Sequence, residues 1–254
     1  MAESVLSIKE KLEKCTLKEL DDFIAFYGSD ERKGVIKLTE TAKKRKQAYF
    51  DEQERLKSIY KYEQKLYDEG CVYVAGVDEV GRGPLAGPVA AAVVILKKDD
   101  LIEGINDSKK LSAQKREELY KVITERAVSY AVGIVSPAEI DEINILQATY
   151  KAMREALSKL SVKPDHLLAD AVTIPLIDVP QTAIIKGDAK SISIGAASIV
   201  AKVTRDKMME EYDKIYPGYG FAQNKGYGSA EHIKAIKEKG ICSIHRKTFV
   251  KNFI

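Results

Sequence analysis

The stretch CVYVAGVDEVGRGPLAGPVAAAVVIL, residues Cys71–Leu96, decides the fold of this 254-residue chain. Its first part, Val72–Asp78, is apolar and β-branched, and its last part, Pro88–Leu96, is a second apolar run rich in valine and small residues. The segment between them, Gly81–Gly87, is rich in glycine and proline and is typical of a turn. Two strand-like runs on either side of such a segment predict a β-hairpin.

Two adjacent acids, Asp78 and Glu79, stand at the end of the first predicted strand. Carboxylates at the tip of a buried strand are costly unless something pairs with them, and a divalent cation is a common partner. Gly81 and Gly83 let backbone N–H groups approach a ligand closely, and Arg82 between them suits a phosphate. The alternative is an ordinary solvated turn, because acidic residues are mostly exposed. Acids beside a phosphate-binding loop favour phosphodiester chemistry.

The bulk composition is that of a soluble globular protein, with 45% hydrophobic and 31% charged residues. The net charge is only +3, so nucleic-acid binding would depend on local patches. Three isolated cysteines, Cys15, Cys71 and Cys242, predict a reducing compartment without structural disulfides. No apolar run is long enough to span a bilayer and no signal sequence opens the chain, so we expect a cytoplasmic protein without a membrane segment.

Residues 1–70 differ from the rest of the chain in their charged, helical sequence pattern. They predict a small helical module, with a second domain over 71–254. Capping-box patterns at Ser7–Glu10 and Thr16–Glu19 predict two short helices, and residues 31–69 are helical and highly charged. The basic cluster Lys43–Lys46 could contact phosphates. Four tyrosines could stack on bases: Tyr49, Tyr60, Tyr62 and Tyr67. The alternative is a solvated helix whose tyrosines are half-buried.

Two more predicted strands deliver acids later in the chain. Residues 165–170 end on Asp170, and residues 181–188 end on Asp188. Neighbouring strands of an α/β sheet lie side by side, so these acids can converge with Asp78 on a metal site. Before these two strands, the patterns predict a helix over 112–126, a strand over 127–135 and a helix over 136–160 with a break near Asn144. After them, the patterns predict helices over 191–215 and 229–239.

Other candidate residues lie in loops. Tyr227 stands between two glycines and beside Lys225, which suits a nucleotide sugar or base, although a tyrosine that anchors the turn fits as well. Lys109 and Lys110 are either phosphate contacts or surface charge. His232 and His245 are too far apart in sequence for a zinc-binding spacing, and with His166 we interpret them as non-ligands.

The segment GVDEVGRGPLAGPV, residues 76–89, resembles the signature of the type 2 ribonuclease H family, bacterial ribonuclease HII. Further stretches match later motifs of that family in order: Asn106–Leu111, Ala169–Asp170, Lys186–Asp188, Ala196–Asp206 and Lys225–Gly228. The resemblance implies a ribonuclease H-like α/β fold, with a mixed central sheet flanked by helices and a C-terminal helical region. The N-terminal module is similar to the extension of some Gram-positive members.

The resemblance also implies an activity and its residues. Four catalytic carboxylates would hold two divalent cations, Mn²⁺ or Mg²⁺: Asp78, Glu79, Asp170 and Asp188. Gly81, Arg82, Gly83 and Tyr227 would recognise a ribose 2′-hydroxyl, with three further substrate contacts expected at Ser108, Lys109 and Lys225. The implied enzyme is an endoribonuclease of DNA repair and replication. It would cut RNA–DNA hybrids and single ribonucleotides embedded in duplex DNA, leaving 5′-phosphate and 3′-hydroxyl ends. The alternatives are another two-metal phosphodiesterase of the junction-resolvase type and a non-catalytic hybrid-binding protein.

Overall fold

The structure, a computed structural model, describes residues 3–253. The chain divides into two compact units, Met1–Lys57 and Ser58–Ile254, and each is described by itself. Helix α4 (Lys61–Asp68) lies within the second compact unit, and the domain boundary expected at residue 70 stays a prediction. The buried Glu63 explains why α4 belongs to that unit, because Oε1 accepts hydrogen bonds from the Ser191 hydroxyl and the Ser193 N–H.

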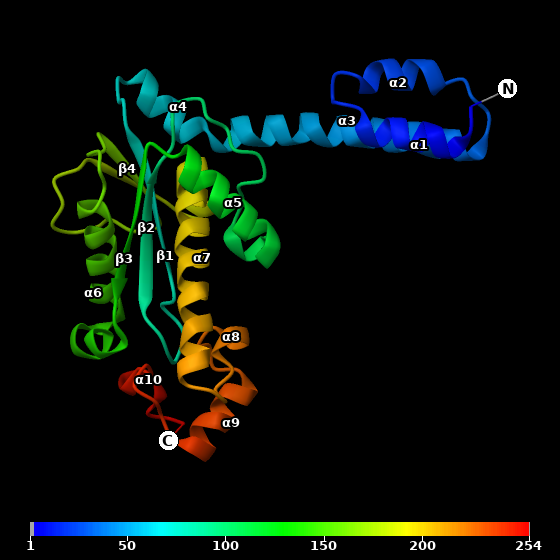
Figure 1. The fold of residues 1–254 in the computed structure, drawn as a ribbon. Coiled ribbons are helices and arrows are strands. Elements are labelled where there is room, and N and C mark those ends of the chain that lie inside the picture. Colours follow the sequence, from blue (N-terminus) through cyan, green and yellow to red (C-terminus); the bar gives the residue numbers. More distant parts are fainter. Residues whose placement is uncertain (1–2, 254) are drawn as a thin grey trace. The chain divides into compact units, whose positions relative to one another are not determined.

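The first unit is a small helical module (Figure 1). Helix α1 (Val5–Lys14), helix α2 (Leu20–Tyr27) and the start of helix α3 (Lys33–Ile59) share one apolar core, made by Ile8, Leu12, Leu20, Phe23, Tyr27, Val35 and Ala42. The predicted helix start at Ser7 is wrong. Ser4 is the N-cap instead, and its hydroxyl accepts a hydrogen bond from the Ser7 N–H.

The second unit is built on a five-stranded mixed sheet in the order β3-β2-β1-β4-β5. Its strands are β1 (Val74–Val80), β2 (Val89–Ile95), β3 (Ser129–Val135), β4 (His166–Asp170) and β5 (Gln181–Ile184). Strands β1 and β2 are antiparallel, which confirms the predicted hairpin, and β3 continues this pattern beside β2. Strands β4 and β5 run parallel to β1, so the acids that follow them reach the same edge of the sheet.

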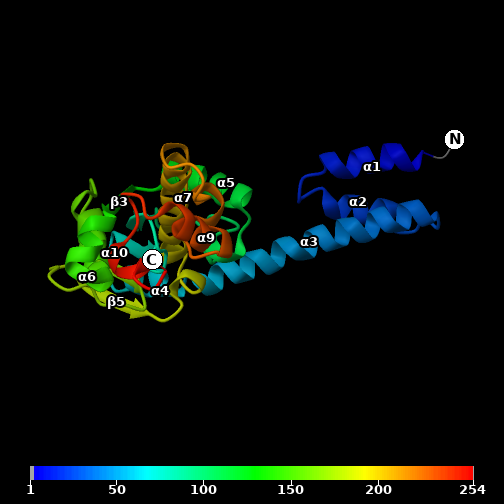
Figure 2. The same ribbon diagram turned by 90° about the horizontal axis from the view of Figure 1, so that it is seen from below.

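Helices cover both faces of the sheet. Helix α6 (Pro137–Ser158) packs on one face, and helix α7 (Ile192–Ile215) packs on the other with helix α5 (Ala113–Arg126) against it (Figure 1). Short helices α8 (Phe221–Asn224), α9 (Ala230–Lys239) and α10 (Lys247–Val250) complete the C-terminal region, with α9 and α10 in the foreground of Figure 2. No helix in residues 3–253 is both long and apolar enough to cross a membrane.

Local sequence signals place most of these helices correctly. Four serines cap α5, α6, α7 and α9, each accepting a hydrogen bond from the N–H three residues on: Ser112, Ser136, Ser191 and Ser229. The predicted break in α6 occurs at Asn144, whose φ is 66°. The last predicted strand is too long, however. Strand β5 ends at Ile184, and Asp188 lies in the short 3₁₀ helix η2 (Gly187–Ala189).

Two glycines let the covering helices approach the sheet closely. A Cβ on Gly76 in β1 would lie 2.1 Å from the carbonyl carbon of Ser193 in α7. A Cβ on Gly133 in β3 would lie 2.0 Å from the carbonyl oxygen of Ala152 in α6. Both contacts are with backbone, which cannot rotate away as a side chain can. The position of α7 over β1 therefore depends on the absence of a side chain at Gly76.

We expect Gly76→Ala to destabilise the second unit, because α7 must shift away from β1. Forcing a methyl group into a closed core typically costs about 1–3 kcal/mol. The free energy of unfolding, measured in urea, should therefore fall by about 1–3 kcal/mol. Gly83→Ala is the matched control, since its Cβ would meet only Tyr227 Cε1 at 3.7 Å. Equal stability of the two variants would contradict this account of the α7–β1 contact.

Candidate active site

The sheet brings the predicted acids together at one edge. Val77 of β1 pairs with Ala169 of β4, so the next residues, Asp78 and Asp170, lie side by side where the β1–β4 pairing ends. Alternation along each strand turns both side chains toward α7, since Val77 and Ala169 belong to the core on the α6 side. Asp188 joins them through η2, where the Gly187 N–H donates to Asp170 Oδ1 at 2.7 Å.

Burial and mutual repulsion set the electrostatics of these acids. The pKa of Asp78 is raised well above its usual value, first by burial and then by the negative charges of Glu79 and Asp170. Burial also raises the pKa of Glu79, although the Arg82 guanidinium opposes this shift. The pKa of Asp188 is raised by burial and by the charges of Asp107 and Asp170. A cation would relieve all of these unfavourable interactions.

The carboxylates fit a divalent cation. Glu79 Oε2 is buried and has no hydrogen-bond partner within residues 3–253, while Oε1 lies 3.4 Å from Arg82 Nη1. A buried acceptor without a donor is costly, and a cation would satisfy it. Within residues 3–253, no group of three or more His, Cys, Asp or Glu side chains is arranged to hold a metal ion by itself. Magnesium-type sites need no such group, because one or two carboxylates suffice when water and substrate phosphate complete the shell.

Two buried serines, Ser198 of α7 and Ser108, lie near Asp78 on the α7 side of the sheet. The Ser198 hydroxyl opposes the rise in the pKa of Asp78, and its Oγ lies 2.9 Å from Ser108 Oγ. Ser108 begins the 3₁₀ helix η1 (Ser108–Lys110) and is only 4% exposed, so its side chain contacts the acid site through Ser198. Lys109, the next residue, lies close enough to lower the pKa of Asp188.

The Gly81–Gly83 loop and Tyr227 also come together. A Cβ on Gly83 would lie 3.7 Å from Tyr227 Cε1, and the Tyr227 side chain remains accessible, with the residue 47% exposed. The Leu85 N–H donates to the Gly226 carbonyl at 2.8 Å, which ties the two loops together. Lys225 is held differently: its Nζ pairs with Glu210 Oε1 at 2.7 Å.

Comparison with known proteins identifies the family. The family model described as "Ribonuclease HII" matches residues 75–252, and "Ribonuclease HII N-terminal domain" matches residues 4–67. The chain is 53% identical to ribonuclease HII of Clostridioides difficile over 99% of its own length and 98% of the relative. It is 60% identical to ribonuclease HII of Lachnoclostridium phytofermentans over 89% and 88%, respectively. This chain belongs to the ribonuclease HII family.

A solved structure agrees with this assignment. The crystal structure of ribonuclease H2 from Pyrococcus horikoshii matches with a TM-score of 0.60 and 31% identity, over 71% of this chain and 96% of that one. The expected ribonuclease H-like fold is therefore confirmed. As a ribonuclease HII, the chain is an enzyme, an endoribonuclease hydrolase, and the family implies metal use.

The sequence missed several residues that this ribonuclease HII fold places around the site. Ser198, Arg205 and Arg246 are all buried. Ser198 and Arg205 lie in the run Ala196–Asp206, where a serine and an arginine among apolar residues were the only available signal. Nothing local marks Arg246, because its contacts are with residues far away in sequence.

A chain of hydrogen bonds through two buried histidines reaches the Tyr227 loop. The Cys242 N–H donates to His245 Nδ1 at 2.9 Å, so a proton of neutral His245 is on Nε2. That N–H faces His232 Nε2 at 3.1 Å, and His232 Nδ1–H donates to the Tyr227 carbonyl at 2.8 Å. The histidines, too distant in sequence for a zinc spacing, thus bind each other and fix the backbone of Tyr227 while both are neutral.

This arrangement predicts a loss of stability in acid. Burial, with the nearby His232, lowers the pKa of His245 from 6.5 to about 4. Between these values the unfolded chain binds a proton that the folded chain does not, so stability falls as the pH decreases. We expect the free energy of unfolding of His245→Gln to depend less steeply on pH in this window, by up to about 1.4 kcal/mol per pH unit. Urea unfolding at pH 4.5, 5.5 and 6.5 measures this, and equal slopes for both proteins would refute it.

Proposed function

We propose that this chain cuts the RNA strand of RNA–DNA hybrids and single ribonucleotides embedded in duplex DNA, leaving 5′-phosphate and 3′-hydroxyl ends. The observation that carries the proposal is the position of the acids: Asp78 and Glu79 are among the last three residues of β1, and the loop that meets Tyr227 begins two residues after Glu79. Its role would be ribonucleotide removal in DNA repair and replication. The three free cysteines favour a reducing location, the cytoplasm.

The proposed metal ligands are Asp78, Glu79, Asp170 and Asp188, for two divalent cations, Mn²⁺ or Mg²⁺. When bound, such ions activate water and stabilise the charge that develops on the phosphate. The raised pKa values of Asp78, Glu79 and Asp188 and the unpartnered Glu79 Oε2 support this assignment. Ser198 would hold the Asp78 carboxylate in place, and the Gly187 N–H would orient Asp170.

The proposed substrate contacts are the Gly81–Gly83 backbone and the ring of Tyr227. The 2′-hydroxyl is the group that distinguishes RNA from DNA at one sugar, and a glycine backbone can approach it closely. Tyr227 has an accessible side chain beside Gly83, so it can pack on that sugar. Lys109, near Asp188, suits the adjacent phosphate, whereas Ser108 would act indirectly through Ser198. Lys225 would contribute mainly through its ion pair with Glu210.

Asp78→Asn tests the catalytic assignment, because it removes a charge and keeps the shape. Losing several kcal/mol of transition-state stabilisation corresponds to at least about a 1000-fold lower cleavage rate, while binding through phosphate contacts should persist. The measurement is single-turnover cleavage of a duplex with one ribonucleotide, alongside its all-DNA twin. Asp68→Asn, at an exposed carboxylate of α4, is the control.

Each competing function gives a different result in the same assay. Equal cleavage of the all-DNA twin by the unmodified protein would indicate a resolvase-type phosphodiesterase. Binding of the ribonucleotide duplex without cleavage, in both Mg²⁺ and Mn²⁺, would indicate a non-catalytic binder. Cleavage by Asp78→Asn within a few-fold of the unmodified protein would refute the role given to Asp78.

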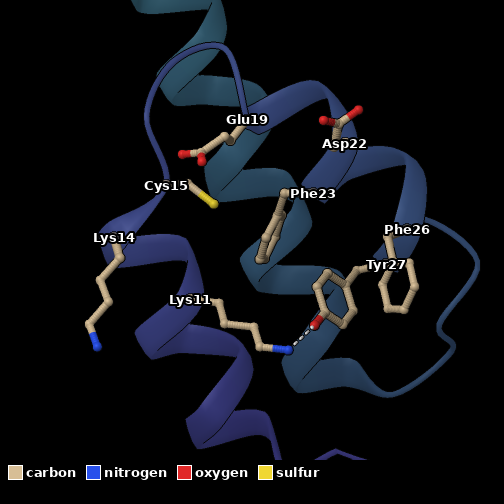
Figure 3. Close-up of a pocket in the computed structure, with 8 residues that line it drawn as sticks. All are labelled: Lys11, Lys14, Cys15, Glu19, Asp22, Phe23, Phe26 and Tyr27. Carbon is tan, nitrogen blue, oxygen red and sulfur yellow. Dashed lines mark hydrogen bonds between the residues drawn. The ribbon is translucent and has the colours of Figure 1, made fainter.

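We also propose that the first unit binds nucleic acid. Its Lys43 and Lys44 are exposed on α3, whereas Arg45 donates to the Leu12 carbonyl and Lys46 pairs with Asp21. A hollow of 540 Å³ beside the exposed ring of Phe26 offers a second surface (Figure 3); it is lined by Lys11, Lys14, Cys15, Glu19, Asp22, Phe23, Phe26 and Tyr27. The hypothesis that four tyrosines of residues 1–70 stack on bases is wrong for two of them. Tyr60 and Tyr67 are buried in the second unit and offer no stacking surface.

Replacing Lys43 and Lys44 by alanine tests this role in the full chain. Each lost phosphate contact should reduce the slope of log affinity against log salt by about 0.9, while kcat at saturating substrate stays unchanged. The measurement is binding to a continuous hybrid at several salt concentrations. Lys57→Ala is the control, because Lys57 is an exposed residue that already pairs with Glu54. An unchanged slope would assign the unit another role.

A further inference from the structure

Two fully buried arginines lie against the Gly81–Pro88 loop. Arg205 belongs to α7 and Arg246 directly precedes α10, and both are 0% exposed. Burying a guanidinium group is costly unless its charge and its N–H groups find partners. What these two side chains contact therefore explains why the fold tolerates them.

Arg246 binds the loop backbone at three points. Its Nε donates to the Gly87 carbonyl at 3.0 Å, its Nη1 to the Arg82 carbonyl at 2.8 Å, and its Nη2 to the Gly81 carbonyl at 2.5 Å. The planar guanidinium fixes the directions of these donors, so the loop cannot rotate without breaking several hydrogen bonds.

Arg205 extends the same contact to the other half of the loop and to the Tyr227 segment. Its Nε donates to the Pro88 carbonyl at 2.8 Å, its Nη2 to the Ala86 carbonyl at 3.2 Å, and its Nη1 to the Lys225 carbonyl at 2.9 Å. One side chain thus holds together the two loops to which we assign substrate recognition.

Neither arginine is paired directly with an acid in residues 3–253, although Asp206 acts on Arg205 and Asp141 on Arg246 from a distance. Within the described part of the chain, neither guanidinium forms an ion pair, and their acceptors are the carbonyl groups above. Burial lowers the pKa of both, and with the repulsion from Arg205 it brings that of Arg246 to about 9. Arginine keeps its proton at neutral pH, so two positive charges lie directly behind the loop.

The hydrogen bonds to the loop carbonyls also fix the directions of the neighbouring backbone N–H groups. In a trans peptide the C=O and the following N–H point in opposite directions, and the described chain contains no cis peptide. With the Gly81 and Arg82 carbonyls directed at Arg246, the N–H groups of Arg82 and Gly83 point away from it. Neither N–H has an acceptor among residues 3–253. The result is a fixed pair of outward donors, backed by positive charge, beside the carboxylates.

We propose that Arg205 and Arg246 are positioning residues that hold the Arg82 and Gly83 N–H groups ready for an electron-rich oxygen of the cleaved strand, the ribose 2′-oxygen. This inference rests on the proposed function. Donors fixed before binding lose little freedom on contact with substrate, so discrimination for RNA depends on the two guanidiniums although neither touches the substrate.

Arg246→Lys tests the proposal, because it keeps the charge and loses the planar fork. The measurements are kcat and KM in Mn²⁺ on a duplex with one ribonucleotide, and KI of its all-DNA twin as a competitive inhibitor. We expect KM to rise by about 10- to 100-fold, as for lost hydrogen bonds to a charged group, while KI changes less than about two-fold. Arg126→Lys, at a surface arginine paired with Asp100, is the matched control and should change neither value.

Each other outcome overturns the proposal. Equal increases in KM and KI would show that the loop holds a phosphate common to both duplexes. A lower kcat with KM and KI unchanged would indicate a merely structural role. If Arg246→Lys does not fold, Arg205→Lys must give the same rise in KM at constant KI. Failure of the unmodified protein to cleave the ribonucleotide duplex would instead refute the proposed function.

Discussion

Asp78 and Asp170 lie side by side where the pairing of β1 with β4 ends, and Asp78 is buried away from water. The negative charges of Glu79 and Asp170 act on the Asp78 carboxylate there. Like charges in such a place repel one another and favour the neutral acids unless a cation is present. The sheet order creates this conflict, since β4 lies directly beside β1. Bringing these carboxylates together costs free energy of folding, and contacts elsewhere in the structure have to offset that cost.

Helix α7 supplies most of that support. Gly76 allows its first turn to approach β1, and the Ser198 hydroxyl, two turns further on, favours the charged form of Asp78. Glu63 fixes the same first turn by accepting hydrogen bonds at Ser191 and Ser193, just after the η2 helix that carries Asp188. Glu63 lies within the residues matched by the N-terminal domain family, yet it belongs to the second compact unit. The N-terminal family region thus contributes a residue that binds the start of α7, the helix that packs on β1.

Parts of the fold that depend on neighbouring residues could be predicted from the sequence. The hairpin and the break at Asn144 depend on residues close together in the chain, and both predictions were correct. The helix start predicted at Ser7 was wrong, because Ser4 is the N-cap. The acids could be predicted because each follows an apolar run. Contacts between distant segments could not be predicted in this way. Nothing near His245 in sequence indicates His232 as its partner, and nothing near Arg246 indicates the Gly81 carbonyl.

The same distinction explains how the site is assembled. The acids and the Gly81–Gly83 loop are consecutive in sequence, so the hairpin alone fixes how far a bound sugar can lie from the proposed metal ligands. The direction in which the loop presents its N–H groups is a different matter, because the guanidiniums that hold its carbonyls come from α7 and from the segment before α10. Tyr227 likewise depends on His232 and on the Gly226 backbone. The proposed metal ligands and the proposed sugar-binding loop thus follow one another in the chain, whereas the hydrogen bonds that hold the loop come from α7 and the C-terminal region.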